Sequence, residues 1–215
     1  MKIGLHNEPV ILSQRLQAEI DAASASQYDA IVLGYALCGK AAHGLVARNI
    51  PLVIPKAHDC ITLFLGSRDI YNQQHAACPG TYWYELDYIE RGALADSPFA
   101  LGSPAGTEHD IGKVYDEYVN KYGKDNADYL MEVMGAWQSH YARAVFIDTG
   151  IAADHLVEDQ AKSQAERRGW KYERIQGDLI LIRRLLAGEW DQDYLVLKDG
   201  EKICMTYDEN VIGAA

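Results

Sequence analysis

The sequence has neither an excess of positive charge nor a long apolar run. Its 215 residues include 20 Lys and Arg against 31 Asp and Glu, for a formal net charge of −11. Nucleic-acid binding needs a basic face, so we expect no nucleic-acid partner. No apolar stretch approaches the roughly 20 residues of a membrane span. The first residues also lack a basic and then apolar leader, so we expect a cytoplasmic protein without membrane association.

Cysteines are few, and no two of them form a C-x-x-C pair. This absence argues against a zinc ribbon and against a thioredoxin motif. A disulfide framework is not expected in a cytosolic chain of this size. The hydrolase signatures G-x-S-x-G and H-E-x-x-H are also missing. Any one cysteine can serve as a small buried apolar residue, and this interpretation suits Cys204. The four are Cys38, Cys60, Cys78 and Cys204.

Two short apolar runs, 30–33 and 51–54, are each followed at once by a loop that contains a cysteine. Short β-branched runs bounded by Gly and Pro predict buried parallel strands. The loops after the carboxyl ends of such strands line the ligand crevice of open α/β sheets. If these two strands are neighbours, Cys38 and Cys60 lie side by side at the functional edge.

The rest of the chain alternates helical and strand patterns, which predicts an α/β fold. We expect one domain over 1–215 with a mainly parallel, Rossmann-like sheet flanked by helices. Residues 92–106 are rich in Gly, Ala, Ser and Pro and precede a helix-rich region, so a loop and helical insertion is expected at about 92–140. Tyr129 and the apolar residues after it are expected in the core. Strands at 194–197 and 202–204 flank Asp199–Gly200, which predicts a C-terminal hairpin.

The loop after the first run resembles the phosphate-binding motif G-x-x-x-x-G-K-[ST] up to its last position. Gly34, Gly39 and Lys40 match, but Ala41 stands where a hydroxyl would bind Mg²⁺. A nucleotide-binding protein with a degenerate P-loop is therefore a minor alternative. A Gly-rich turn still brings backbone N–H groups close to a ligand. We take Gly34, Tyr35 and Gly39 as candidate ligand-binding residues.

The loop after the second run contains Lys56, His58 and Cys60. Cys60 is expected in the first turn of a helix capped by Asp59 or His58. The helix macrodipole and Lys56 would both favour its thiolate, so Cys60 is a candidate nucleophile or metal ligand. His58 is a candidate base or nitrogen ligand, and a capping or surface role is equally open. Lys56 and Trp83 are further candidates for ligand binding, although Trp83 can equally belong to the core.

Five segments together resemble an uncharacterised family of bacterial and archaeal proteins, domain of unknown function 1638. They are YDAIVLGYALCG, IPLVIPKAHDCITLFLGS, PGTYWYE, KYGKDNADYL and FIDTG, and they span nearly the whole chain. Members with this pattern often occur beside corrinoid-dependent methyl-transfer systems. The resemblance therefore implies a role in methyl-group or one-carbon metabolism, with a corrinoid-system protein as a candidate partner. The family pattern also includes an earlier strand with another cysteine, whereas this sequence has none before Cys38.

Two classes of function follow. The first is a zinc or iron–sulfur site built from Cys38, Cys60 and His58, with His6 or Cys78 completing it. Two thiolates and an imidazole suit zinc, whereas an iron–sulfur cluster needs three or four thiolates. The second is a metal-free small-molecule-binding protein, or an enzyme with Cys60 as nucleophile and His58 or His43 as base. The sequence leaves open whether the protein is an enzyme and whether it forms a homo-oligomer.

Overall fold

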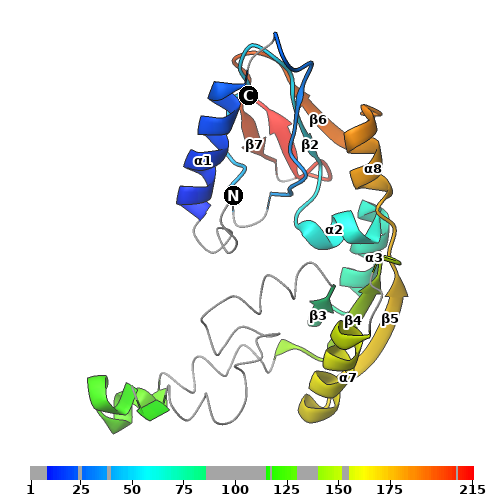
Figure 1. The fold of residues 1–215 in the computed structure, drawn as a ribbon. Helices are drawn as coiled ribbons and strands as arrows, with labels where there is room; N and C mark the ends of the chain where they lie inside the picture. The colour runs from blue at the N-terminus through cyan, green and yellow to red at the C-terminus, as the bar shows by residue number, and fades with distance from the viewer. Residues whose placement is uncertain are drawn as a thin grey trace. The chain divides into compact units, whose positions relative to one another are not determined.

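The structure is a computed structural model with a mixed α/β fold (Figure 1). It describes residues 9–23, 26–37, 40–85, 115–116, 118–129, 140–151, 155–206 and 208–215. The chain divides into two compact units. Unit 1 comprises Met1–Gln73 and Gly177–Ala215, and unit 2 comprises Gln74–Gln176. The chain passes from unit 1 to unit 2 within helix α3 (Arg68–Ala77) and returns after strand β5 (Lys171–Gln176).

Unit 1 contains the two runs that the sequence predicts as parallel strands. Strand β1 (Ile31–Val32) pairs in parallel with β2 (Leu52–Pro55), which confirms that prediction. Strand β6 (Tyr194–Leu197) pairs antiparallel with the other edge of β2. All four residues of β2 are buried, since it is the central strand of this sheet.

Helices cover both faces of this sheet. Leu52 and Ile54 share one buried cluster with the apolar face of α1 (Pro9–Ala22), namely Leu12, Leu16 and Ile20. Val53 points to the opposite face, where it shares a cluster with residues of α8 (Ile180–Ala187). This alternation follows from the two-residue period of a strand. Helix α1 begins at Pro9, since a proline in the first turn loses no helical hydrogen bond.

The expected hairpin between 194–197 and 202–204 is wrong. A turn does form between them, with the N–H of Glu201 donating to the carbonyl oxygen of Lys198 at 3.0 Å. However, β6 is paired with β2, while β7 (Ile203–Met205) is paired with β8 (Ile212–Ala214). Each of these pairings buries apolar residues, Leu197 in β6 and Ile203 and Ile212 in the β7–β8 pair. The C-terminal hairpin is therefore β7–β8.

Unit 2 is built on a parallel sheet in the order β3–β4–β5. Strand β3 (Thr81–Tyr84) lies beside β4 (Arg143–Asp148), and α7 (Leu156–Arg168) connects β4 to β5. Tyr84 and Phe146 share a buried cluster with Val157 and two alanines of α7. The aromatic run 82–84 is therefore a strand, and its Trp83 lies in unit 2 with the Arg143 guanidinium 5.9 Å from its ring.

Part of the predicted helix-rich region is described. Residues 115–116, 118–122 and 124–129 are helical, and the predicted break at Gly123 is confirmed by a φ of +80°. The expected burial of Tyr129 is wrong, because its exposed fraction is 64%. Ala127 is buried instead. Because Ala127 precedes Tyr129 by two residues, or about 200° around a helix, the buried face of this helix lies opposite Tyr129. The loop at 92–106 lies outside the described residues.

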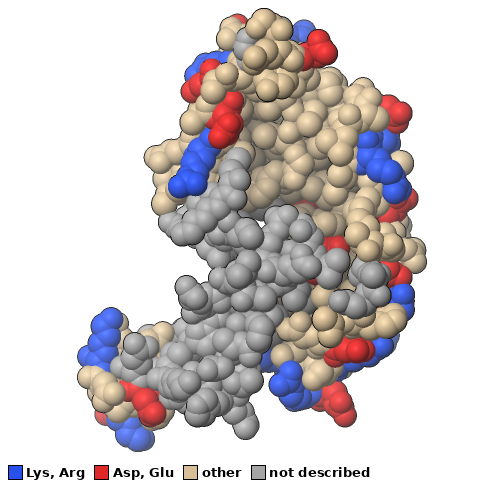
Figure 2. Space-filling view, in the orientation of Figure 1, with Lys and Arg blue, Asp and Glu red and all other residues tan. Residues whose placement is uncertain are grey.

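Charged side chains on the face shown in Figure 2 are interspersed, with Lys and Arg lying close to Asp and Glu. None of the helices that the structure describes is both long and apolar enough to cross a membrane.

Candidate functional site

The loops that follow β1 and β2 run beside one another in unit 1. The backbone N–H of Leu33 donates to the carbonyl oxygen of Val53 at 2.8 Å, and that of Leu37 donates to Ala57 at 3.1 Å. Leu37 also accepts a hydrogen bond from the N–H of Lys40 at 3.1 Å. Cys38 and Gly39 lie between these two residues in the sequence and are outside the described part of the chain. The two predicted loops therefore leave the sheet at the same edge.

The described residues between Gly34 and Gly44 do not have the form of a P-loop. A P-loop leads directly into a helix, whose first N–H groups hold the phosphates. Here residues 41–44 are turns, and Ala41 and Ala42 are buried in the core of unit 1. Gly34 is exposed, and the ring of Tyr35 packs against the same core. Among the described residues of this segment, no α-helix begins whose N-terminus could hold phosphates as a P-loop does.

Helix α2 (Cys60–Leu65) begins at the cap that the sequence predicts. Asp59 has extended backbone angles, and its Oδ1 atom accepts from the N–H groups of Ile61 and Thr62 at 3.0 and 3.4 Å. The cap is therefore Asp59 rather than His58. The Oδ2 atom of Asp59 accepts a hydrogen bond from the hydroxyl of Tyr71 in α3 at 3.0 Å. Cys60 is the first residue of α2 and is half-buried.

A pocket of about 370 Å³ opens beside this loop. The β2–α2 loop, α2 and α3 provide one wall, and the turn before β8 provides the other. Among the residues predicted for the site, His58 lines the pocket, and its side chain is exposed. The lining residues are His58, Thr62, Arg68, Tyr71, Asn72, Asp208, Glu209 and Val211.

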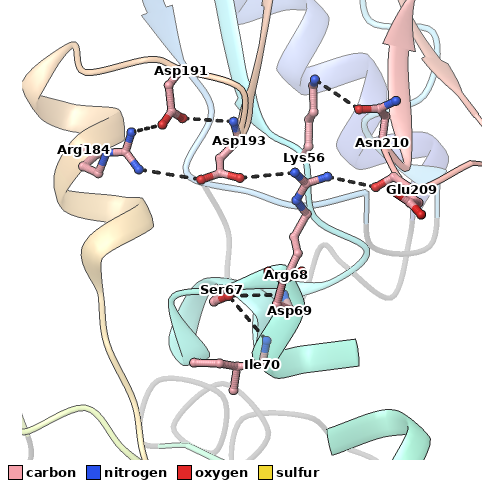
Figure 3. Close-up of polar contacts among 10 residues, drawn as sticks. All are labelled: Lys56, Ser67, Arg68, Asp69, Ile70, Arg184, Asp191, Asp193, Glu209 and Asn210. Atoms are coloured by element: carbon pink, nitrogen blue, oxygen red, sulfur yellow. Dashed lines mark hydrogen bonds and ion pairs between the residues drawn. The ribbon is translucent and has the colours of Figure 1, made fainter. Parts of the chain in front are cut away.

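Arg68 is held at the pocket by a chain of alternating charges (Figure 3). One terminal nitrogen donates to the main-chain oxygen of Glu209 at 2.8 Å, and the other lies 3.2 Å from Oδ1 of Asp193. Asp193 also faces Arg184, with 3.7 Å between Oδ2 and Nη1, and Arg184 in turn pairs with Asp191. Hydrogen bonds from the Asp193 N–H and from Arg184 hold the pKa of Asp191 below its usual value.

The turn that forms the second wall is fastened to the rest of unit 1. Nζ of Lys56 donates to Oδ1 of Asn210 at 3.4 Å, so this predicted residue lies next to the pocket (Figure 3). Within the turn, Asp208 accepts from the hydroxyl of Thr206 at 2.8 Å and from the N–H of Asn210 at 2.9 Å. Both hydrogen bonds lower the pKa of the Asp208 carboxyl, and the one from Thr206 has the larger effect.

None of the other predicted site residues that the structure describes is among those that line the pocket. Trp83 and Cys78 belong to unit 2, and His6 lies outside the described residues. His43 is exposed in the 41–44 turn. Within the described ranges, no three His, Cys, Asp or Glu side chains come together to form a metal site. The ligand set that includes Cys38 stays a prediction.

Sequence reasoning missed most of the lining. Arg68 and Tyr71 fall in a segment expected only to be helical, with no signal that this face of the helix meets a pocket. Asp193 is 125 positions from Arg68, and no local pattern joins two residues that far apart. Asp208 and Glu209 belong to a turn whose position depends on the β7–β8 pairing.

Comparison with known proteins gives a family for this chain. No curated protein and no solved structure matched it. A family model described as Protein of unknown function (DUF1638) matches residues 1–186. The match includes β1, β2 and the wall of the pocket that contains His58 and Arg68, whereas the turn with Asp208 and Glu209 follows it in the sequence. The resemblance seen in the sequence motifs is thus confirmed, and the chain belongs to the DUF1638 family.

Proposed function

We propose that this protein binds a small polar molecule in the pocket beside the β2–α2 loop. The pocket itself is the observation that carries the proposal: its volume of about 370 Å³ lies at the small end of the range for ligand sites. It also follows the carboxyl end of a strand with a parallel neighbour, the edge at which α/β sheets bind ligands.

The lining suits a polar ligand. His58 offers an imidazole that can donate or accept a hydrogen bond, and Thr62 and Asn72 add a hydroxyl and an amide. Tyr71 is oriented by its hydrogen bond to Asp59, so the wall it belongs to is anchored at the α2 cap. Val211 contributes an apolar surface on the opposite wall. An exposed imidazole at such a site can also act in proton transfer.

A fragment and metabolite screen by protein-observed NMR tests this proposal. The expected ligand binds to wild-type protein and loses affinity in His58→Ala and in Asn72→Leu. Two matched controls are His43→Ala, an exposed histidine of unit 1, and Gln73→Leu, the exposed neighbour of Asn72. Binding that persists unchanged in both pocket variants, or that is lost equally in the controls, would contradict the proposal.

A second candidate function is metal binding by Cys38, Cys60 and His58. The observation that favours it is the backbone hydrogen bond from the N–H of Leu37 to the oxygen of Ala57. Cys38 and His58 directly follow these two residues in the sequence, so the hydrogen bond brings together the segments that carry them. Thiolate and imidazole donors suit zinc, which would act as a Lewis acid toward a ligand beside His58. An iron–sulfur cluster needs more thiolates than these two.

Elemental analysis after anaerobic purification tests the metal. Stoichiometric zinc or iron is expected in wild-type protein and in Cys204→Ser, a cysteine of β7 that serves as control. The metal should be lost in Cys38→Ser and in Cys60→Ser. Wild-type protein without metal would refute this candidate and leave the pocket proposal standing.

We propose two further properties of this protein, one of its topology and one of its metabolic role. A Rossmann-like topology is supported by the parallel strands β3, β4 and β5 and by the helix that connects two of them. We also propose a link to corrinoid-dependent methyl transfer, which is what the resemblance of the sequence motifs implies. Co-purification with a corrinoid protein from the native cell is the measurement that checks this link.

A further inference from the structure

The two walls of the pocket carry charges of opposite sign. Among the lining residues, Arg68 is the permanently charged one that comes from the β2–α2 loop, α2 and α3. The opposite wall carries two carboxylates, Asp208 and Glu209. A ligand with only one sign of charge would face a like charge on one of the walls, which costs binding energy.

Arg68 has hydrogen-bonding capacity left for a ligand. Its two contacts within the described structure, to Glu209 and Asp193, use two of the five N–H groups of a guanidinium. Its side chain is 25% exposed and is held in place by both contacts. The Asp193 carboxylate contacts both Arg68 and Arg184, so its single negative charge does not fully offset the positive charge of Arg68. A carboxylate is one of the groups that a guanidinium recognises with two parallel hydrogen bonds.

The acidic wall can receive a cation. The contact described for Glu209 involves its main-chain oxygen, so the carboxylate remains available to a ligand. Asp208 is fixed by hydrogen bonds from Thr206 and Asn210 and contributes a stable negative charge. The carboxylate of Asp59, by contrast, is taken up by Ile61, Thr62 and Tyr71. An ammonium group is the simplest partner for this wall.

We infer that the ligand is a small zwitterion bearing one carboxylate and one ammonium group, the chemistry of a free amino acid. This inference rests on the proposed function, because it names the class of molecule that the pocket binds. Arg68 and the amide of Asn72 receive the carboxylate, and Glu209 with Asp208 receives the ammonium group. Dicarboxylates and nucleotide phosphates are disfavoured by the acidic wall, and diamines by Arg68.

Calorimetric titration of the full chain with matched compounds tests the inference. The twenty standard amino acids are screened first, followed by L-norvaline, its analogue without the carboxylate, butylamine, and its analogue without the ammonium group, pentanoate. At least one amino acid is expected to bind about tenfold or more tightly than either kind of single-charge analogue, since each lost ion pair removes a charge-assisted hydrogen bond.

Two variants assign the charges to the walls. Arg68→Gln and Glu209→Gln should each weaken amino-acid binding by about tenfold. Arg48→Gln and Glu19→Gln, both exposed in unit 1 away from the pocket, should leave it unchanged. Glu209 is exposed on a turn, so its variant tests the second wall even if Arg68→Gln fails to fold.

The failure of this inference is distinguishable from the failure of the proposed function. If butylamine or pentanoate binds as tightly as the best amino acid, and His58→Ala or Asn72→Leu weakens that binding, the pocket binds ligands but the zwitterion is wrong. The zwitterion is also wrong if an amino acid binds to Arg68→Gln and Glu209→Gln as tightly as to wild type. If nothing in the panel or the fragment screen depends on the pocket residues, the proposed function is wrong and the inference is wrong with it.

Discussion

The hydroxyl of Tyr71 donates a hydrogen bond to Oδ2 of Asp59 at 3.0 Å, while Oδ1 of the same carboxylate caps helix α2. One carboxylate therefore joins the start of α2 to the middle of α3. Both helices line the pocket, so this contact holds its first wall together.

Removing this carboxylate should cost more than removing the hydroxyl. Asp59→Ala loses the cap and the bond from Tyr71, which together contribute about 2 kcal/mol to the free energy of unfolding. Tyr71→Phe loses the second of these interactions and keeps the cap, for about 1 kcal/mol. Urea denaturation measures both, with Glu19→Ala on the exposed face of α1 as control. Equal losses for Asp59→Ala and Tyr71→Phe would show that the cap contributes nothing.

Gly66 should tolerate alanine far less well than Gly188. Both residues end a helix with positive φ, +73° and +77°, so an alanine at either costs about 1 to 2 kcal/mol in backbone conformation. A Cβ on Gly66 would also lie 2.4 Å from the main-chain oxygen of Asp178, whereas a Cβ on Gly188 meets open space. This close approach exists because the N–H of Asp178 donates to the oxygen of Phe64 at 2.9 Å.

We therefore expect Gly66→Ala to lose roughly 3 kcal/mol or more, since a backbone clash adds to the conformational cost. Gly188→Ala serves as the matched control, and the difference between the two variants isolates the contact. Thermal and urea unfolding of both variants measure it. Similar losses at the two positions would mean that the α2 terminus moves away from Asp178 at little cost.

Local sequence patterns predicted the strands that position the site. The β-branched runs predict both strands, of which β2 is fully buried and β1 half-buried. The Asp59 cap follows from a short polar residue before an apolar run. The parallel pairing of these two strands then places their exit loops together, as Leu37 and Ala57 show. Residue type and spacing suffice for this part of the site.

The rest of the site depends on pairing between distant segments. Strand β6 is an apolar run that could pair with β7 across a good turn, yet it completes the edge of β2 instead. Its position brings Asp193 to Arg68, and the β7–β8 pairing brings Glu209 to the same guanidinium. The periodicity of a sequence indicates whether a segment is a helix or a strand, but not which strand it pairs with. The position of Asp208 and Glu209 at the pocket could therefore not be predicted.

Arg143 should be the most sensitive charged residue of unit 2. Its side chain is 8% exposed and donates to Thr81 at 2.9 Å, to Glu173 at 2.9 Å and to both oxygens of Gln74 at 3.0 and 3.1 Å. Arg143→Met removes the donor of these four hydrogen bonds and is expected to lose about 3 kcal/mol, although Glu173 keeps its ion pair with Lys171 at 2.5 Å. Amide hydrogen exchange of β3, β4 and β5 is the local readout.

The control for Arg143 is Arg167→Met, an exposed arginine of α7. The double variant Arg143→Met with Glu173→Met removes the main charge partner as well, and should lose less stability than Arg143→Met alone. A double variant that is less stable than the single one would show that packing accounts for the loss, rather than a Glu173 carboxylate left with Lys171 as its remaining partner.

Asp148 should make the stability of unit 2 sensitive to acid. Its Oδ2 atom lies 2.6 Å from Arg174, and its Oδ1 atom accepts from the N–H of Gly150 at 2.9 Å. These contacts hold the pKa of Asp148 below its ordinary value of 3.8. The unfolded chain therefore binds more protons than the folded one, so stability falls as the pH falls. The contribution of Asp148 is fully present above the ordinary value and is lost as pH falls through the folded value.

Asp148→Asn removes this contribution at every pH. The variant should therefore be less stable than wild type at pH 7, and the difference should shrink as the pH is lowered from 5 to 3. Urea unfolding at a series of pH values, followed by hydrogen exchange of β4 and β5, measures this difference. Ser163→Ala, an exposed position on α7, should keep the pH dependence of wild type. A constant difference between wild type and Asp148→Asn across this range would contradict the assignment, because only a group with a lowered folded pKa loses its contribution there.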